Sequence, residues 1–289
     1  MPELPNIAST SGWVRLRTWA GYTLFAGILA WAMVDAPNIL WQIKPLWLLM
    51  SVPFILLNLL FQVIQIRIFL FDRGVATPQW RIPVYFTLKK AVLNIVMPFR
   101  TGTLLMLRML TNHYPVTSID FVGFMVAASL YSLLFSILGA VWLFLPGVWF
   151  ISSLILFLLV LIMARYIPKI PFSKCVWPLF FITIGLFFTF SAGLWSLFQG
   201  FGYALPPRET VTMAVILNLM ALVNVTPGNI GIREMVMGAI APMLAVPIAV
   251  GVLVGAAFLS VRIALVGLLL WCMEAGIFLA KKNDNPPRS

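Results

Sequence analysis

Apolar runs of about 20 residues recur along almost the whole chain, from residue 19 to residue 279. A helix of that length spans the ~30 Å hydrocarbon core of a bilayer, where backbone groups must bond to one another because no water is present. Hydrophobic residues make up 62% of the chain, and no polar stretch is long enough to form a separate soluble domain. The sequence therefore predicts an all-α polytopic membrane protein, with residues 1–289 in a single integral membrane domain.

Six of the runs are long enough for full spans, whereas two other segments are interrupted. The expected spans are residues 16–34, 46–71, 120–145, 148–164, 177–199 and 248–280. The interrupted segments, residues 84–110 and 210–246, contain prolines, glycines and charges. Each of their arms would measure about 18–24 Å as a helix, which is short of the ~30 Å core. We therefore expect six full transmembrane helices plus two re-entrant helical hairpins.

The distribution of basic residues tests this topology. Arg15 and Arg17 place the N-terminus inside under the positive-inside rule. The later basic loops and the pair Lys281-Lys282 also fall inside if both interrupted segments enter and leave the membrane on the same side. We expect both termini in the cytoplasm and residues 283–289 as a disordered tail. The net charge of +11 then reflects this bias, and we expect no nucleic-acid partner.

The order of elements repeats after about 130 residues. This offset places the first three spans on the last three and one interrupted segment on the other. A short echo supports it, because residues 91–98 read AVLNIVMP and residues 221–227 read ALVNVTP. Each half has an odd number of crossings, so the second copy is inverted. We expect an inverted repeat with halves at residues 13–146 and 147–282.

Arginines lie at or near the breaks. Arg100 and Arg233 fall at the hairpin tips, and Arg262 lies in the last span, more than a dozen residues from either end. In inverted-repeat transporters, broken helices meet near the midplane and aim their positive N-termini at an anionic group. A guanidinium group binds phosphate oxygens in a bidentate manner, so we expect a phosphate site here. The alternatives are kinked helices with interfacial loop charges, and an ion pair between Arg262 and Glu234.

Polar and flexible residues around the breaks complete the predicted site. Glu234 is expected to orient Arg233, to cap the second half-helix, or to couple protons. The asparagines of the breaks also satisfy backbone groups that the breaks release. The remaining substrate-binding candidates are Asn94, Thr101, Gly102, Asn224, Pro227, Gly228, Asn229 and Gly231. Three basic residues on the inner side, Lys89, Lys90 and Arg108, either collect anionic headgroups or are ordinary positive-inside charges.

The sequence contains few groups for catalysis. Cys175 and Cys272 stand alone in apolar surroundings, and His113 is the single histidine. We therefore expect no disulfide, no metal and no cofactor, and no enzymatic activity. A phosphate-binding loop of the Walker type is also absent from the sequence, which argues against direct nucleotide-driven pumping.

Two motifs resemble a known family. Residues 94–102 read NIVMPFRTG, residues 227–234 read PGNIGIRE, and an arginine follows in the last span. Together they resemble the transmembrane flippase domain family of lysylphosphatidylglycerol synthases, as a stand-alone member without the soluble synthase domain. The resemblance implies lipid translocation, with Arg100, Arg233, Glu234 and Arg262 at matching positions. Thr103 stands where many members carry an acidic residue.

The sequence thus favours a lipid flippase that works by alternating access in a prokaryotic cytoplasmic (inner) membrane. Its substrate would be a lipid of the bilayer with an anionic phosphate headgroup, and both phospholipids and polyprenyl phosphates fit. Three other readings stay open: a transporter of a small soluble anion, a non-transporting partner of a lipid-modifying enzyme or glycosyltransferase, and an intramembrane enzyme.

Overall fold

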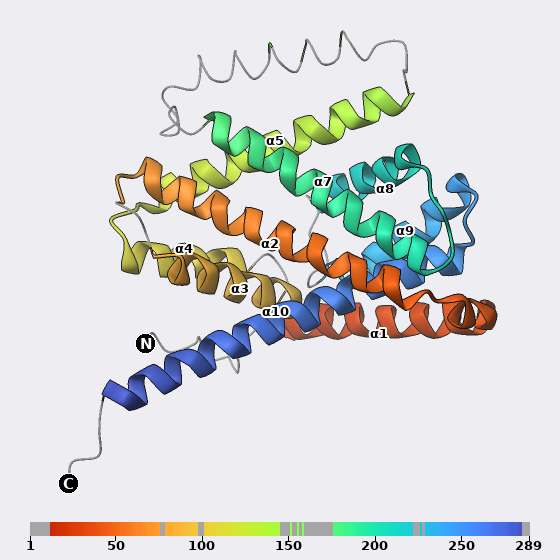
Figure 1. Ribbon diagram of the computed structural model, residues 1–289, viewed down its shortest axis with the longest axis horizontal. Coiled ribbons are helices and arrows are strands. Elements are labelled where there is room, and N and C mark those ends of the chain that lie inside the picture. Colours follow the sequence, from red (N-terminus) through yellow and green to blue (C-terminus); the bar gives the residue numbers. More distant parts are fainter. Residues whose placement is uncertain are drawn as a thin grey trace.

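The computed structural model describes residues 12–75, 79–97, 101–144, 151, 155, 158, 176–221, 226 and 229–284. All regular structure in these residues is helical (Figure 1). The long helices are α1 (Gly12–Asp35), α2 (Pro45–Asp72), α5 (Ser118–Phe144), α7 (Val176–Gly200) and α10 (Ile248–Asp284). The shorter ones are α3 (Arg81–Val96), α4 (Thr101–His113), α8 (Pro207–Met220) and α9 (Ile232–Ile240), with 3-10 turns η2 (Pro37–Gln42) and η4 (Ala241–Leu244).

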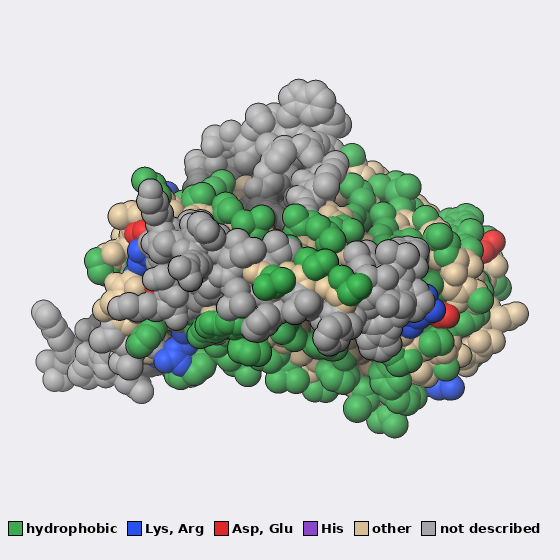
Figure 2. Space-filling model, turned by 90° about the horizontal axis from the view of Figure 1, so that it is seen from above, with side chains coloured by type: hydrophobic (Ala, Val, Ile, Leu, Met, Phe, Trp, Pro, Cys, Tyr) green, Lys and Arg blue, Asp and Glu red, His purple; other side chains and the backbone are tan. Residues whose placement is uncertain are grey.

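Four helices of the described part are long and apolar enough to cross a membrane. They cover Pro45–Asp72, Ser118–Ile137, Trp177–Gly200 and Ile248–Gly276. Large hydrophobic side chains are exposed along them, and in Figure 2 apolar surface separates charged groups at two ends of the molecule. Since such a surface is stable against lipid tails, the protein is a helical membrane protein, as predicted.

The other two predicted spans are not among these four membrane-spanning candidates. Residues 16–34 lie in α1, which is helical but is not among these four helices. The predicted span 148–164 lies outside the described residues, apart from Ile151, Ile155 and Leu158, which are helical and exposed.

Each interrupted segment contains two short α-helices, and the second also contains a 3-10 turn. Residues 84–110 are divided between α3 and α4, and residues 210–246 among α8, α9 and η4. Within each pair the helices contact one another. The predicted breaks coincide with the gaps between these helices. Of the residues at the breaks, 98–100, 222–225 and 227–228 lie outside the described part.

Helices α2 and α7 form the centre of the bundle and pack together along much of their length (Figure 1). Amide groups join them inside this apolar contact. Asn58 Nδ2 of α2 donates hydrogen bonds to the Leu186 carbonyl at 2.9 Å and to Thr189 Oγ1 at 3.1 Å. Gln62 Nε2 donates in turn to Asn58 Oδ1 at 3.0 Å. Polar side chains that bond across membrane helices each contribute about 0.6–2 kcal/mol, so they help to fix this pair.

The remaining helices are arranged around this pair. Helix α5 contacts α7 and α8, and helix α10 contacts α2 and α3. An ion pair ties the end of α2 to the start of α5, because Arg73 Nη1 lies 3.1 Å from Asp120 Oδ1. The structure therefore places the short helix pairs α3–α4 and α8–α9 beside the long helices rather than apart from them.

Glycines allow α9 to approach α10 closely. A Cβ atom on Gly251 would lie 2.5 Å from the Met237 carbonyl oxygen, and one on Gly238 would lie 2.8 Å from Val252 Cγ2. Gly255 also faces α9. Small residues at such spacing let membrane helices pack backbone to backbone. Helix α9, and with it Arg233 and Glu234, is thereby held firmly against the last span.

Candidate functional site

The start of α9 is an irregular turn whose shape depends on two positive φ angles, 56° at Asn229 and 82° at Gly231. Thr226 Oγ1 donates to the Ile230 carbonyl at 2.9 Å, which closes the turn. The Gly231 N–H donates to Glu234 Oε2 at 2.7 Å. A glutamate at the third helical position commonly caps the first turn in this way. Of the roles predicted for Glu234, the structure supports the capping role, and this side chain is only 1% exposed.

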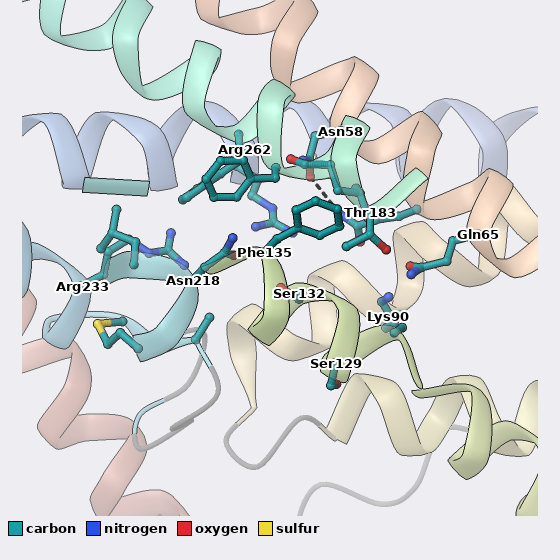
Figure 3. Close-up of a pocket in the computed structure, with 18 residues that line it drawn as sticks. Asn58, Gln65, Lys90, Ser129, Ser132, Phe135, Thr183, Asn218, Arg233 and Arg262 are labelled. Carbon is teal, nitrogen blue, oxygen red and sulfur yellow. Dashed lines mark hydrogen bonds between the residues drawn. The ribbon is translucent and has the colours of Figure 1, made fainter. Parts of the chain in front are cut away.

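A polar cavity lies among the helices, and we call it the central cavity (Figure 3). It has a volume of about 330 Å³ and adjoins a second space of about 270 Å³. Both are lined by Gln62, Lys90, Ala221, Arg233 and Arg262. Residues of α2, α3, α4, α5, α7, α8, α9 and α10 line one or both spaces, so nearly every described helix contributes to them.

Three cationic side chains meet at this cavity. Figure 3 shows Arg262 of α10, Arg233 of α9 and Lys90 of α3 reaching it from different helices. Arg262 lies close enough to Arg233 for their charges to repel. The Arg233 guanidinium carbon lies 5.7 Å from the ring centre of Phe258, a buried residue, which supports that side chain.

Carboxylates are absent from the described lining of both spaces. The possible ion pair between Arg262 and Glu234 is not formed: in the described part, no carboxylate lies within ion-pairing distance of Arg262. Glu234 interacts electrostatically with Arg233, its neighbour. The described lining itself carries basic side chains and no acidic one, and such a lining favours an anionic ligand.

Amide and hydroxyl groups form the rest of the polar lining, and sequence reasoning did not single them out. They are Asn58, Gln62, Gln65, Ser129, Ser132, Thr183 and Asn218. A signal was available for three of them, because Asn58, Gln62 and Gln65 recur at intervals of four and three within an apolar span. The spacing places them on one face of α2. Such groups can bind hydroxyl or phosphate oxygens of a ligand.

Two asparagines at the breaks lie beside the cavity, whereas part of the backbone that they are expected to satisfy lies outside the described residues. Asn94 and Asn229 both line the second space, and Asn229 is 3% exposed. Their Oδ1 atoms are buried and have no hydrogen-bond partner among the described residues. A buried acceptor without a partner costs about 1–3 kcal/mol. Each oxygen therefore needs a donor that the described residues do not supply, and the backbone-satisfying role expected for these asparagines stays a prediction.

The other predicted residues separate into those near the cavity and those away from it. Lys89 lies 3.6 Å from Glu274 and stacks on Tyr85, outside the described lining. Arg108 is exposed on α4. Of the three predicted headgroup-collecting residues, Lys90 alone lines the cavity. The remaining predicted residues Arg100, Asn224, Pro227 and Gly228 lie outside the described part.

Two predicted site residues lie at the start of α4, and one of them, Gly102, decides how closely α4 packs on α3. A Cβ atom on Gly102 would overlap the Lys90 carbonyl oxygen and lie 2.7 Å from Asn94 Oδ1. Glycine is thus required for α4 to approach α3. Thr101 opens α4, and its buried Oγ1 has no hydrogen-bond partner in the described part.

The described residues hold no group of three or more His, Cys, Asp or Glu side chains that could bind a metal. No protein-family model, curated protein or solved structure matches this chain. What the site can do is therefore argued from its own geometry: it can bind an anion with additional polar groups inside an apolar protein.

Proposed function

We propose that the protein moves a lipid with an anionic phosphate headgroup across the membrane, and that the phosphate binds in the central cavity. One observation carries this proposal: Lys90, Arg233 and Arg262 reach one cavity whose described lining contains no carboxylate. Basic side chains that converge on one cavity give it a positive potential, which attracts an anion. Two guanidinium groups and an ammonium group provide suitable donors for phosphate oxygens.

The topology we propose has six full spans and two re-entrant hairpins, α3–α4 and α8–α9. Helix lengths support it, because α8 has 14 residues and α9 has 9. At 1.5 Å per residue these reach about 21 Å and 14 Å, too short for a ~30 Å core. Helix α3 with 16 residues and α4 with 13 residues are also too short.

The pattern of contacts supports the inverted repeat with halves 13–146 and 147–282. If α2, α3 and α5 correspond to α7, α8 and α10, each contact between halves should have a counterpart. The contact of α5 with α8 is matched by that of α10 with α3, and the contact of α5 with α7 by that of α10 with α2. Ala91 and Ala221, which begin the two echoed segments, both line the second space. The cavity then lies on the pseudo-twofold axis.

Alternating access follows from this arrangement as part of the proposal. The first half contributes Lys90 and Asn58 to the cavity, and the second half contributes Arg233, Arg262 and Asn218. Because both halves line one site, a rocking motion between them would open it to each leaflet in turn. The proposed setting is a prokaryotic cytoplasmic membrane with both termini inside, in agreement with the family resemblance of the sequence.

Reconstitution into liposomes tests this function. We expect fluorescent phosphatidylglycerol or a fluorescent polyprenyl phosphate to cross the bilayer faster with the protein than without it. Arg262→Gln and Arg233→Gln should slow this movement by about tenfold or more, because each lost charged hydrogen bond is worth about 1.5–3 kcal/mol. Arg108→Gln, on the exposed face of α4, is the matched control and should leave the rate unchanged. Equal rates in all four proteins would reject the proposal.

A further inference from the structure

An apolar groove runs between α4 and α5, and we call it the α4–α5 groove. It has a volume of about 380 Å³. Leu104 and Leu107 of α4 form one wall, and Val122, Val126 and Leu130 of α5 form the other. Leu104 is 62% exposed and Val126 is 49% exposed. On a membrane protein, a groove with such exposed apolar walls opens toward the lipid tails.

The α4–α5 groove shares lining residues with both polar spaces. Thr103 and Met125 line both the groove and the second space, where Asn94, Arg233 and Arg262 also lie. Ser129 lines both the groove and the central cavity. Polar surface at the inner end therefore gives way to hydrocarbon surface at the outer end. That gradient matches one molecule with a charged head and an apolar chain.

Loose packing between α4 and α5 creates the groove. These two helices contact one another sparingly, whereas α9 and α10 pack closely through Gly238, Gly251 and Gly255. In the proposed repeat, α9–α10 is the counterpart of α4–α5. The space between α4 and α5 in the first half is therefore absent between α9 and α10 in the second half. The opening lies on one side of the molecule.

We propose that the α4–α5 groove holds a hydrocarbon chain of the lipid whose phosphate occupies the central cavity; this inference rests on the proposed function and names the path of the tail. A small soluble anion would need no apolar groove. A single flexible chain suits both the shape and the apolar lining.

Photochemical labelling tests the path of the tail directly. The probe is phosphatidylglycerol with a diazirine on one acyl chain, in liposomes that contain the full chain, and adducts are mapped by mass spectrometry. We expect labelling of Leu104, Leu107, Val126 and Leu130 to exceed that of Phe188 on α7 and Leu268 on α10, two exposed apolar residues away from the groove. Arg262→Gln should remove this excess, because the headgroup no longer anchors the chain.

A second measurement separates failure of the groove from failure of the site. Glycerol phosphate carries a phosphate group without a hydrocarbon tail, and its binding to the purified protein reports on the cavity alone. If it binds in an Arg262-dependent manner while the chain probe labels all lipid-facing residues equally, the groove assignment is wrong and a soluble anion is the ligand. If glycerol phosphate does not bind and no excess labelling occurs, the proposed function falls as well.

A substitution that fills the groove provides the functional test. Val126→Trp adds bulk at an exposed wall position, and Leu268→Trp makes the same addition on the lipid-facing surface of α10. We expect Val126→Trp to slow lipid movement by about tenfold, the equivalent of about two methylene groups left unburied, with unchanged binding of glycerol phosphate. Leu268→Trp should match the wild type. Equal lipid movement in both variants would overturn the assignment.

Discussion

Two adjacent residues at the start of α9 have separate tasks. Glu234 is buried and accepts a hydrogen bond from the Gly231 N–H, whereas Arg233 reaches the central cavity. The capped turn is what directs Arg233 toward the cavity. The motif that is visible in the sequence is therefore partly a structural device and partly a binding element.

Substitution of Glu234 separates these tasks. Glu234→Ala removes the acceptor of the Gly231 N–H, and the lost cap and buried donor should cost about 1–3 kcal/mol. Glu234→Gln keeps an oxygen that can accept the same bond and should lose less stability. Thermal unfolding in detergent measures both. Equal destabilisation in the two variants would show that the charge, and not the cap, matters.

Lys89 and Lys90 provide a matched pair because they are neighbours in sequence with different surroundings. Lys90 lines the cavity, whereas Lys89 pairs with Glu274 outside it. Lys90→Gln should weaken the binding of glycerol phosphate by about tenfold, the effect of about 1.4 kcal/mol. Lys89→Gln should leave the affinity unchanged. Isothermal titration of the detergent-solubilised protein compares them, and equal losses would contradict the assignment of Lys90.

The residues of the site could be predicted from the sequence to different degrees. Arg233 and Arg262 were found because a charge in an apolar run needs a reason. The sequence does not predict which of Lys89 and Lys90 faces the cavity. Neighbouring residues differ by about 100° around the helix axis, and the rotation of α3 about its axis is set by the helices packed against it. The polar face of α2 with Asn58, Gln62 and Gln65 is readable from its spacing, but the spacing does not say that this face meets the arginines.

At the scale of helices, close packing of α10 against α9 explains why the short α9 is fixed. Gly251 leaves no space for a side chain, because a Cβ atom would lie 2.5 Å from the Met237 carbonyl oxygen. Gly267 lies further along the same helix, and a Cβ atom there meets nothing within 4 Å. The two glycines therefore differ only in their surroundings.

Alanine at these two positions should have opposite effects. Gly251→Ala forces α9 and α10 apart and should destabilise the protein by about 1–3 kcal/mol, the usual cost of overpacking. Gly267→Ala should be neutral or stabilise by up to about 1 kcal/mol, because alanine has the better helix propensity. Thermal unfolding of both variants is the measurement. Destabilisation by Gly267→Ala as large as by Gly251→Ala would contradict the packing argument.

Element boundaries were predictable where the chain breaks helices. The interruptions predicted in residues 84–110 and 210–246 match the gaps between α3 and α4 and between α8 and α9. Hydropathy does not predict which helices are in contact. An apolar helix face is equally stable against lipid tails and against the apolar side chains of another helix. The α2–α7 pairing and the gap between α4 and α5 therefore became known only from the structure.

For the whole molecule, the central issue is whether the two proposed halves move as units. Helices α5 and α8 belong to different halves and touch where a Cβ atom on Gly139 would lie 2.7 Å from Val215 Cγ2. Helices α9 and α10 belong to the same half, and a Cβ atom on Gly238 would lie 2.8 Å from Val252 Cγ2. Both pairs are near enough for the Cβ separation of about 3.5–4.5 Å that a disulfide requires.

Cysteine pairs at these positions test the rocking motion. In a background with Cys175 and Cys272 replaced by serine, Gly139→Cys with Val215→Cys should stop lipid movement on oxidation, and a reducing agent should restore it. Gly238→Cys with Val252→Cys should cross-link as readily but keep transport, because its disulfide lies within one half. If both disulfides stop transport, the motion takes place inside the second half. If neither disulfide stops transport, the α5–α8 contact stays closed throughout the cycle.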